Sequence, residues 1–391
     1  MISIGTDGWA SSSFALDPNP HRLIVVLLRG AIDGLSVVVP YREPSYYGDR
    51  PNIAIPQPGE PNGAIDLDGQ FGLHPALAPL LPLWQQQSLA FVHSCGSNDE
   101  TRSHFDAQDY LESGTPGVKS TRDGWMNRLL GVMSGKNPIQ AVSVGSTTPR
   151  ILLGKIAVAN LPSGKAATNR LQIDKPQVAS AFDKLYTSND AISRTYQEAR
   201  IARTELLKDL EAEMQIANNG ATLPNGFPGD AQRLARLMAR DARIQVSYLA
   251  VGGWDTHINQ GASQGQLARN LGQLGRGLVG LQAELGSVYQ NTTIVVMSEF
   301  GRTVKENGNG GTDHGHGNVM WLMGGGIRGG KVYGKWAGLA PEQRYQGRDL
   351  AVTTDFRDVL GTVLTRGVGI DSGKLSRIFP KYQGKILDFI G

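Results

Sequence analysis

A glycine-rich segment in the last third of the chain, G-T-D-H-G-H-G-N, contains three side chains that can bind a metal ion. They are Asp313, His314 and His316, which all fall within four consecutive residues. Mixed imidazole and carboxylate ligands suit Zn, Mn or Fe, whereas Ca²⁺ and Mg²⁺ sites are built from oxygen ligands. The segment therefore predicts a site for one or two divalent transition-metal ions, with zinc as the first choice.

Further acids and a histidine occur where the chain leaves apolar runs. Asp255 and His257 lie in G-G-W-D-T-H, Glu299 follows T-T-I-V-V-M-S, and Asp33 follows the apolar run at residues 22–28. Each has an ordinary alternative, because a single polar residue at such a place is often a helix cap, a turn residue or an ion-pair partner. Together with the 313–316 segment, however, they predict one shared set of metal ligands.

Two hydroxyl groups are candidate nucleophiles, Ser103 and, as the second choice, Thr101. Both stand at the expected start of a helix, where backbone N–H groups and the helix dipole stabilise an anion. That setting suits attack on a phosphate-like group, and Arg102 between them could clamp the substrate's oxygen atoms. The alternative is that the hydroxyl only caps the helix and that Arg102 is a solvated charge.

Buried strands must position these residues. Continuous apolar runs predict strands at residues 22–28, 88–92, 244–251 and 293–297. Helical spacing predicts helices at residues 103–112, 231–241, 264–289 and 354–365. The alternation predicts an α/β fold with a mostly parallel central sheet flanked by helices. Ligands of such sheets bind beyond the carboxyl ends of the strands, which is where the polar residues cluster.

The bulk composition excludes several classes of protein. The chain has 391 residues, 40% of them hydrophobic, and a formal net charge of +3 without long runs of like charge. Neither nucleic acid nor an anionic membrane is therefore an expected partner. The single cysteine, Cys95, allows no internal disulfide, and no apolar run has the length of a membrane span.

At these motifs the chain resembles the DUF1501 family, which is placed in the alkaline-phosphatase-like superfamily of phosphatases and sulfatases. The matching segments lie at residues 28–41, 101–110, 252–257, 298–303 and 313–318. They read L-R-G-A-I-D-G-L-S-V-V-V-P-Y, T-R-S-H-F-D-A-Q-D-Y, G-G-W-D-T-H, S-E-F-G-R-T and D-H-G-H-G-N. The resemblance spans nearly the whole chain.

The resemblance implies an alkaline-phosphatase-like three-layer sandwich with a two-metal site. It implies hydrolysis of a phosphate ester, or less favourably a sulfate ester, of a small molecule or a glycan, with Ser103 as the nucleophile. Residue by residue, the positions that resemble metal ligands are Asp33, Asp255, His257, Glu299 and either His314 or His316.

The chain departs from the superfamily pattern at three places, and the departure at Phe300 supports a second reading. Phe300, not a histidine, follows Glu299; His257 comes two residues after Asp255 where the superfamily has four; and Cys95 lacks the sulfatase pattern that follows a modified cysteine. The alternative function is a catalytically degenerate member that binds metal and a cell-surface glycan or protein partner.

The expected organisation is a flexible segment at residues 1–20 and a single domain at residues 21–391, with a helical cover or cap at about 175–241. Family members often carry a twin-arginine leader, so the resemblance implies a periplasmic or secreted protein whose mature form lacks its leader. A cytoplasmic location fits the polar N-terminus less well. The sequence leaves the oligomeric state open.

Overall fold

The computed structural model describes residues 20–133, 137, 139–145, 147–163 and 226–391. Its main feature is a nine-stranded sheet. Eight strands lie in the order β11-β5-β10-β9-β1-β8-β6-β7, and the ninth, β12, pairs with β5. The strands are β1 (Arg22–Leu28), β5 (Leu89–Gly96), β6 (Ala141–Val144), β7 (Ala159–Leu161), β8 (Val246–Val251), β9 (Thr292–Ser298), β10 (Asn318–Gly324), β11 (Lys331–Tyr333) and β12 (Thr354–Asp355). All neighbouring strands are parallel except that β10 runs antiparallel to both β5 and β9.

The central strand β1 shows why the apolar runs form this sheet. Every residue of R-L-I-V-V-L-L is buried, because helices cover both faces. Alternate side chains enter different cores: Leu23, Val25 and Leu27 point to one, and Ile24, Val26 and Leu28 to the other.

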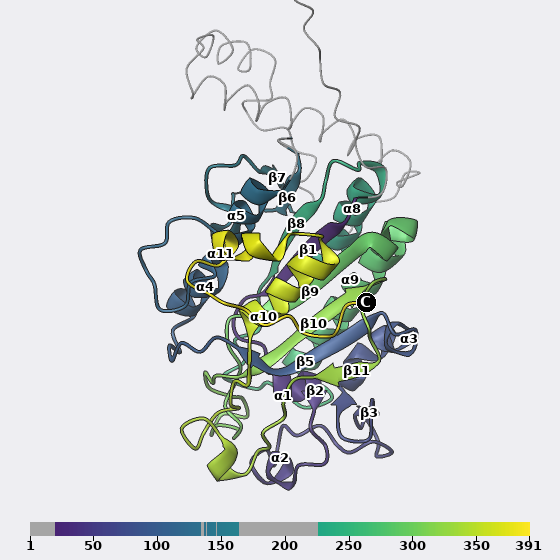
Figure 1. The fold of residues 1–391 in the computed structure, drawn as a ribbon. Helices are drawn as coiled ribbons and strands as arrows, with labels where there is room; N and C mark the ends of the chain where they lie inside the picture. Colours follow the sequence, from purple (N-terminus) through teal and green to yellow (C-terminus); the bar gives the residue numbers. More distant parts are fainter. Residues whose placement is uncertain (1–19, 134–136, 138, 146, 164–225) are drawn as a thin grey trace, which may run out of the picture.

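Helices form a layer on each face of the sheet (Figure 1). One core is completed by α3 (Leu81–Gln85), α8 (Phe227–Arg240) and α9 (Gln266–Leu285). The other is completed by α4 (His104–Ser113), α5 (Trp125–Val132), α10 (Phe356–Thr362) and α11 (Leu375–Ile378). The predicted α/β architecture, with a mostly parallel sheet between two helical layers, is confirmed.

Shorter elements complete the described chain. A three-stranded sheet is formed by β2 (Val38–Val39), β4 (Gly72–Leu73) and β3 (Ile65–Asp66). The short helices are α1 (Gly34–Val37) and α2 (Pro44–Gly48). The 3-10 and π turns are η1 (Pro75–Leu80), η2 (Arg150–Leu152), η5 (Gly286–Asn291), η6 (Pro341–Gln343), η7 (Val363–Gly367) and η8 (Ser372–Lys374). Within the described residues no helix combines the length and apolarity needed to cross a membrane.

The sequence-based element boundaries hold at some strands and shift at others. β1 has the predicted bounds, whereas β5 continues four residues beyond the predicted end because His93 and its neighbours are buried. The predicted helix at residues 354–365 begins only at Phe356, since β12 takes the first two residues. Of the expected cover at about 175–241, residues 175–225 lie outside the described residues, and the remainder forms α8 in the layer with α9. The expected flexible segment at residues 1–20 also lies outside them, apart from Pro20.

Strand direction determines where polar residues meet. The carboxyl ends of β1, β5, β8 and β9 lie at one edge of the sheet because these strands are parallel to one another. Since β10 is antiparallel, its beginning lies at the same edge, and the segment before it arrives there too. The loops after β5, β8 and β9 and the loop before β10 therefore converge.

Candidate metal centre

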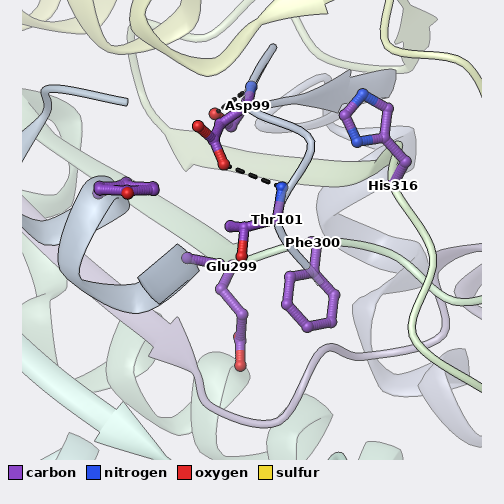
Figure 2. Close-up of a pocket in the computed structure, with 8 residues that line it drawn as sticks. Asp99, Thr101, Glu299, Phe300 and His316 are labelled. Atoms are coloured by element: carbon purple, nitrogen blue, oxygen red, sulfur yellow. Dashed lines mark hydrogen bonds between the residues drawn. The ribbon is translucent and has the colours of Figure 1, made fainter. Parts of the chain in front are cut away.

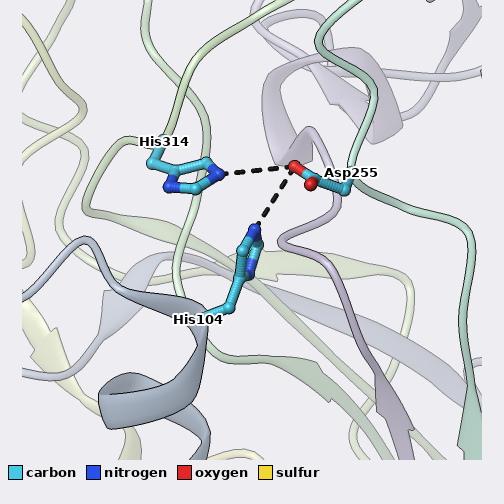
Figure 3. A group of neighbouring side chains, drawn as sticks. All are labelled: His104, Asp255 and His314. Carbon is cyan, nitrogen blue, oxygen red and sulfur yellow. Dashed lines mark hydrogen bonds and ion pairs between the residues drawn. The ribbon is translucent and has the colours of Figure 1, made fainter.

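Three histidines from three separate loops meet at this edge of the sheet. His104 is the first residue of α4, which follows β5; His257 lies after β8; and His314 lies before β10. They surround Asp255, which also follows β8. Figure 3 shows His104 and His314 both pointing at the same oxygen of the Asp255 carboxylate.

One carboxylate oxygen of Asp255 is the common point of the cluster. Asp255 Oδ1 lies 3.3 Å from His104 Nε2, 3.0 Å from His257 Nε2 and 3.4 Å from His314 Nε2. The Nε2 atoms of His257 and His314 are themselves 2.9 Å apart. All three imidazoles thus present the same ring nitrogen to one small volume.

The other ring nitrogen of each histidine faces an oxygen atom. His104 Nδ1 lies 2.8 Å from Glu299 Oε1, His257 Nδ1 lies 3.1 Å from Asp313 Oδ1, and His314 Nδ1 lies 2.7 Å from the carbonyl oxygen of Arg102. With the ring proton on Nδ1, where these oxygens can accept it, each Nε2 directs its lone pair at the cluster. Metal-binding histidines characteristically have this arrangement, with a carboxylate or carbonyl behind the ring.

The cluster lacks internal partners that would satisfy these lone pairs. His104 Nε2 is buried and has no hydrogen-bond partner among the described residues. Two imidazole lone pairs 2.9 Å apart repel each other unless a proton or a cation lies between them. His104, Asp255 and His314 also form the one group of at least three candidate ligands found in the described part of the chain. With His257 added, three nitrogens and a carboxylate match the ligands that zinc takes.

The charges around the cluster also suit a divalent cation. Asp255, Glu299 and Asp313 each contact at least one of the three rings, and Arg302 pairs with Asp255. The hydrogen bond from His104 to Glu299 raises the pKa of His104, because the carboxylate favours positive charge on the ring. A metal ion at Nε2 would supply that charge in place of a proton.

Arg302 holds the Asp255 carboxylate from behind. Its Nη2 donates to Asp255 Oδ1 at 2.5 Å and to the backbone carbonyls of Gly30 and Trp254. Nε and Nη1 of this buried guanidinium donate to the carbonyls of Ala31 and Thr312. Burial alone would raise the pKa of Asp255, but the hydrogen bond and charge of Arg302 outweigh it and lower the pKa to about 2. Asp255 is therefore ionised at neutral pH.

A model of the family described as "Protein of unknown function (DUF1501)" matches residues 20–378. The chain belongs to the DUF1501 family. The family resemblance that the sequence motifs carry is thus confirmed over most of the chain. No curated protein matches the sequence.

Several solved structures align with this chain at low sequence identity. A protein in the alkaline phosphatase superfamily from Vibrio parahaemolyticus has a TM-score of 0.38 at 11% identity, covering 88% of this chain and 66% of that one. The C-terminal periplasmic domain of EcEptC from Escherichia coli has a TM-score of 0.35 at 12% identity, covering 95% and 89%. The alkaline phosphatase of the Antarctic bacterium TAB5 has a TM-score of 0.33 at 10% identity, covering 81% and 94%.

Glu299 of the DUF1501 segment S-E-F-G-R-T lies behind a ligand. Its Oε1 accepts hydrogen bonds from His104 Nδ1, Gly30 N and Gln108 Nε2 at 2.8, 2.8 and 2.9 Å. Its Oε2 accepts one from Ser298 Oγ at 2.9 Å. Burial would raise the pKa of Glu299, but these donors, His104 first, lower it. Glu299 thus contacts Nδ1 of His104, and Asp313 contacts Nδ1 of His257 in the same way.

Asp33, expected as a ligand, stands apart from this cluster. It is fully buried, and its carboxylate pairs with Arg50, whose Nη1 lies 2.6 Å from Oδ2 and whose Nη2 lies 3.1 Å from Oδ1. Ser36 Oγ and Gln260 Nε2 also donate to Oδ2, each at 2.7 Å. Burial would raise the pKa of Asp33, but Arg50 outweighs it and the pKa is lowered. Both oxygens are therefore already occupied by donors.

His316, the other late histidine, also lies outside the cluster. It is buried, and its ring stacks on Tyr345 with the centroids 4.1 Å apart. Figure 2 shows it among the side chains that line a small pocket. The pocket is lined by Ser97, Asp99, Thr101, Ala107, Tyr110, Glu299, Phe300 and His316.

The candidate nucleophiles stand at the start of α4, as expected. Ser103 is the N-cap, and its exposed Oγ accepts a long hydrogen bond of 3.5 Å from Asp106 N. Thr101 Oγ1 accepts from Ser103 N at 3.2 Å. The Arg102 guanidinium is bound to the buried Asp349, with Nη2 and Nε lying 2.7 and 3.1 Å from Oδ2. Ser103 is adjacent in the chain to the candidate ligand His104.

His104 is a candidate ligand that the sequence analysis does not single out. It stands inside the segment T-R-S-H-F-D-A-Q-D-Y, at the start of the helix expected at residues 103–112. The available signal was an imidazole directly after the candidate nucleophile, at the strand-to-helix turn where ligands bind.

Proposed function

We propose that this protein is a metal-dependent hydrolase of phosphate esters, and less favourably of sulfate esters, whose substrate is a small molecule or a glycan ester. The observation that carries the proposal is the convergence of the His104, His257 and His314 Nε2 atoms on Asp255 Oδ1. One divalent transition metal, zinc by preference, would be held by these four residues and would stabilise negative charge on the transferring group. Manganese or iron would fit the same donors.

Ser103 is the proposed nucleophile. Its Oγ would attack the phosphorus, the bond between phosphorus and the ester oxygen would break, and the hydroxyl proton would end on the departing alcohol. Water would then hydrolyse the phosphoserine and restore the hydroxyl. The exposure of Ser103 and the length of its 3.5 Å capping bond support this role, because the hydroxyl is only weakly engaged. Thr101 is the second choice.

Two arginines supply positive charge beside His314 for an anionic substrate. Asp349 Oδ2 accepts from Arg102, and Asp349 Oδ1 accepts from Arg348 Nε at 2.8 Å. One buried carboxylate thus orients two guanidinium groups, which leaves a net positive charge there. Arg348 also donates to the carbonyl oxygen of His314. Guanidinium groups held in this way suit phosphate or sulfate oxygens.

The test is hydrolysis of p-nitrophenyl phosphate by the metal-loaded protein. We expect turnover to cease with a chelator and to return with Zn²⁺. Ser103→Asn should still cap α4 and bind metal but lose at least about 1,000-fold in kcat. Turnover by Ser103→Asn at the wild-type rate would contradict the nucleophile, and turnover unaffected by the chelator would contradict the metal-dependent mechanism. Bis-p-nitrophenyl phosphate and p-nitrophenyl sulfate distinguish the ester classes.

A second function has an observation of its own. Phe300 stacks on His104 with the centroids 5.0 Å apart and lies 5.2 Å from His314, so an apolar ring stands where the superfamily resemblance implies another histidine. That arrangement favours a single metal in a catalytically inactive protein that binds a cell-surface glycan or a protein partner. This alternative predicts one bound metal and no turnover of any of the three esters.

The proposed location is the periplasm or the outside of the cell. It rests on the family resemblance, because residues 1–19 lie outside the described residues. Fractionation of cells that express the full-length gene with its own upstream sequence would test it, and recovery only in the cytoplasm would contradict it.

A further inference from the structure

The loops that carry the metal ligands are joined by one buried amide, Gln260. Its Oε1 accepts hydrogen bonds from Thr256 Oγ1 at 2.7 Å and from Thr312 Oγ1 at 2.9 Å. Thr256 stands between the ligands Asp255 and His257, and Thr312 stands two residues before the ligand His314. Gln260, Thr256 and Thr312 are all at most 1% exposed. The amide oxygen therefore bridges both ligand loops away from water.

The backbone of the same two loops is also paired. Thr312 N donates to the carbonyl oxygen of Thr256 at 3.1 Å, and Gln260 N donates to that of Gly310 at 2.9 Å. These bonds bring the loops together, and the two threonine hydroxyls then fix their relative position through one acceptor atom.

Asp33 determines which way the Gln260 amide points. Gln260 Nε2 donates to Asp33 Oδ2 at 2.7 Å, and an ionised carboxylate can only accept hydrogen bonds. A flipped amide would place its oxygen against the carboxylate and its NH₂ group against two hydroxyls. Arg50 keeps Asp33 ionised and extends the network, because its Nε and Nη2 donate to the carbonyls of Val304 and Thr303 at 2.7 and 2.9 Å. The network thus joins β1, both ligand loops and the segment after β9.

We propose that Gln260, oriented by the Asp33–Arg50 ion pair, is a positioning residue that holds the two ligand loops in the geometry needed for metal binding. The inference rests on the metal centre of the proposed function. It assigns Asp33 a role in place of the ligand role that the sequence predicts for it. Groups behind metal ligands commonly change metal affinity by about 10- to 100-fold when they are removed.

The test measures the dissociation constant of Zn²⁺ by competition with a chelator in Thr256→Val, Thr312→Val and the double variant. Valine keeps the shape of threonine and removes the donor. We expect each single variant to bind Zn²⁺ more weakly and the double variant to lose about 10- to 100-fold. The two losses should combine non-additively, because both hydroxyls act on one acceptor. Thr256→Ser, which restores the hydroxyl, should bind with near wild-type affinity.

Thr292→Val is the matched control. Thr292 is equally buried, but its hydroxyl donates to the carbonyl of Val288 at 2.7 Å at the far end of β9. It should lower the melting temperature of the metal-free protein without changing Zn²⁺ affinity. Wild-type affinity in the folded double variant would overturn the positioning role while leaving the metal centre intact. Absence of Zn²⁺ binding in the wild type would overturn the metal centre itself.

Discussion

At the residue scale, the directions of the two ring nitrogens distinguish the candidate ligands from the residues behind them. His104, His257 and His314 each direct Nδ1 at an oxygen and Nε2 at Asp255. Glu299 differs because its Oε1 already receives three donors, His104 Nδ1 among them. A carboxylate so placed increases the electron density of the imidazole and fixes its orientation.

Glu299→Gln tests this division of roles. The amide oxygen can keep the three hydrogen bonds at Oε1, and its NH₂ group can donate to Ser298 Oγ, so the fold should be preserved. Loss of the negative charge behind His104 should weaken metal binding by about 10- to 100-fold without abolishing it. The measurement is Zn²⁺ competition with a chelator. Complete loss of the metal in the folded variant would show instead that Glu299 is a direct ligand.

At the element scale, close contact between glycine-rich segments brings His314 to the site. Gly301 N donates to the carbonyl of His316 at 2.9 Å, and Gly315 N donates to that of Gly301 at 2.8 Å. A Cβ atom on Gly301 would lie 1.8 Å from the carbonyl oxygen of Gly317. The two segments can approach this closely only because neither carries side chains at these points.

Gly301→Ala should therefore destabilise the protein and displace the ligand loop. The expected loss is about 3 kcal/mol in the free energy of unfolding, measured with denaturant, because backbone must move to remove the clash. Gly131→Ala is the control, since nothing lies within 4 Å of its Cβ position on α5, and it should stabilise the protein by about 0.5 kcal/mol. Equal effects of the two substitutions would contradict the close-contact account.

The sequence predicts the elements better than the details of the site. β1, β8, α9 and β9 follow from apolar runs and helical spacing, because burial on two faces leaves a clear pattern. The antiparallel direction of β10 left no such pattern, and it is what brings His314 to the edge of the sheet.

Ligand roles depend on contacts between distant residues. Asp33 and Glu299 have a residue type and a strand-end position typical of ligands, and the structure pairs Asp33 with Arg50 and Oε1 of Glu299 with His104. Such pairings between residues far apart in the chain cannot be read from spacing. For His104, the position after Ser103 was visible, but its three-dimensional convergence with His257 and His314 was not.

At the scale of the whole molecule, two buried histidines away from the metal centre link stability to pH. His93 Nε2 lies 3.0 Å from the carbonyl of Val38, while its Nδ1 accepts from Ser94 N at 3.0 Å. His74 has the same arrangement with the carbonyl of Ala262 and with Ala76 N. Burial lowers the pKa of each ring to about 4 from its usual 6.5. A second ring proton would face a backbone N–H group.

These shifts predict loss of stability in mild acid. Between pH 6.5 and 4 the unfolded chain binds protons that the folded protein excludes, so the stability that each histidine contributes is complete above pH 6.5 and is lost as the pH falls. From pH 8 to pH 5 each should account for a loss of about 2 kcal/mol. Denaturant unfolding at pH 8 and at pH 5 measures this loss in the free energy of unfolding. The loss should be smaller by about 2 kcal/mol in His93→Gln than in the wild type. The same loss in both proteins would contradict the shifted pKa of His93.

The first measurement to make is the metal content of protein purified without a chelator, by elemental analysis. The four-residue centre predicts one equivalent of a transition metal in the wild type and in His316→Ala, and none in His104→Ala. Cooperative thermal unfolding transitions should show that all three proteins are folded. Metal retained by His104→Ala, or lost from His316→Ala, or absent from the wild type, would contradict the centre formed by His104, Asp255, His257 and His314.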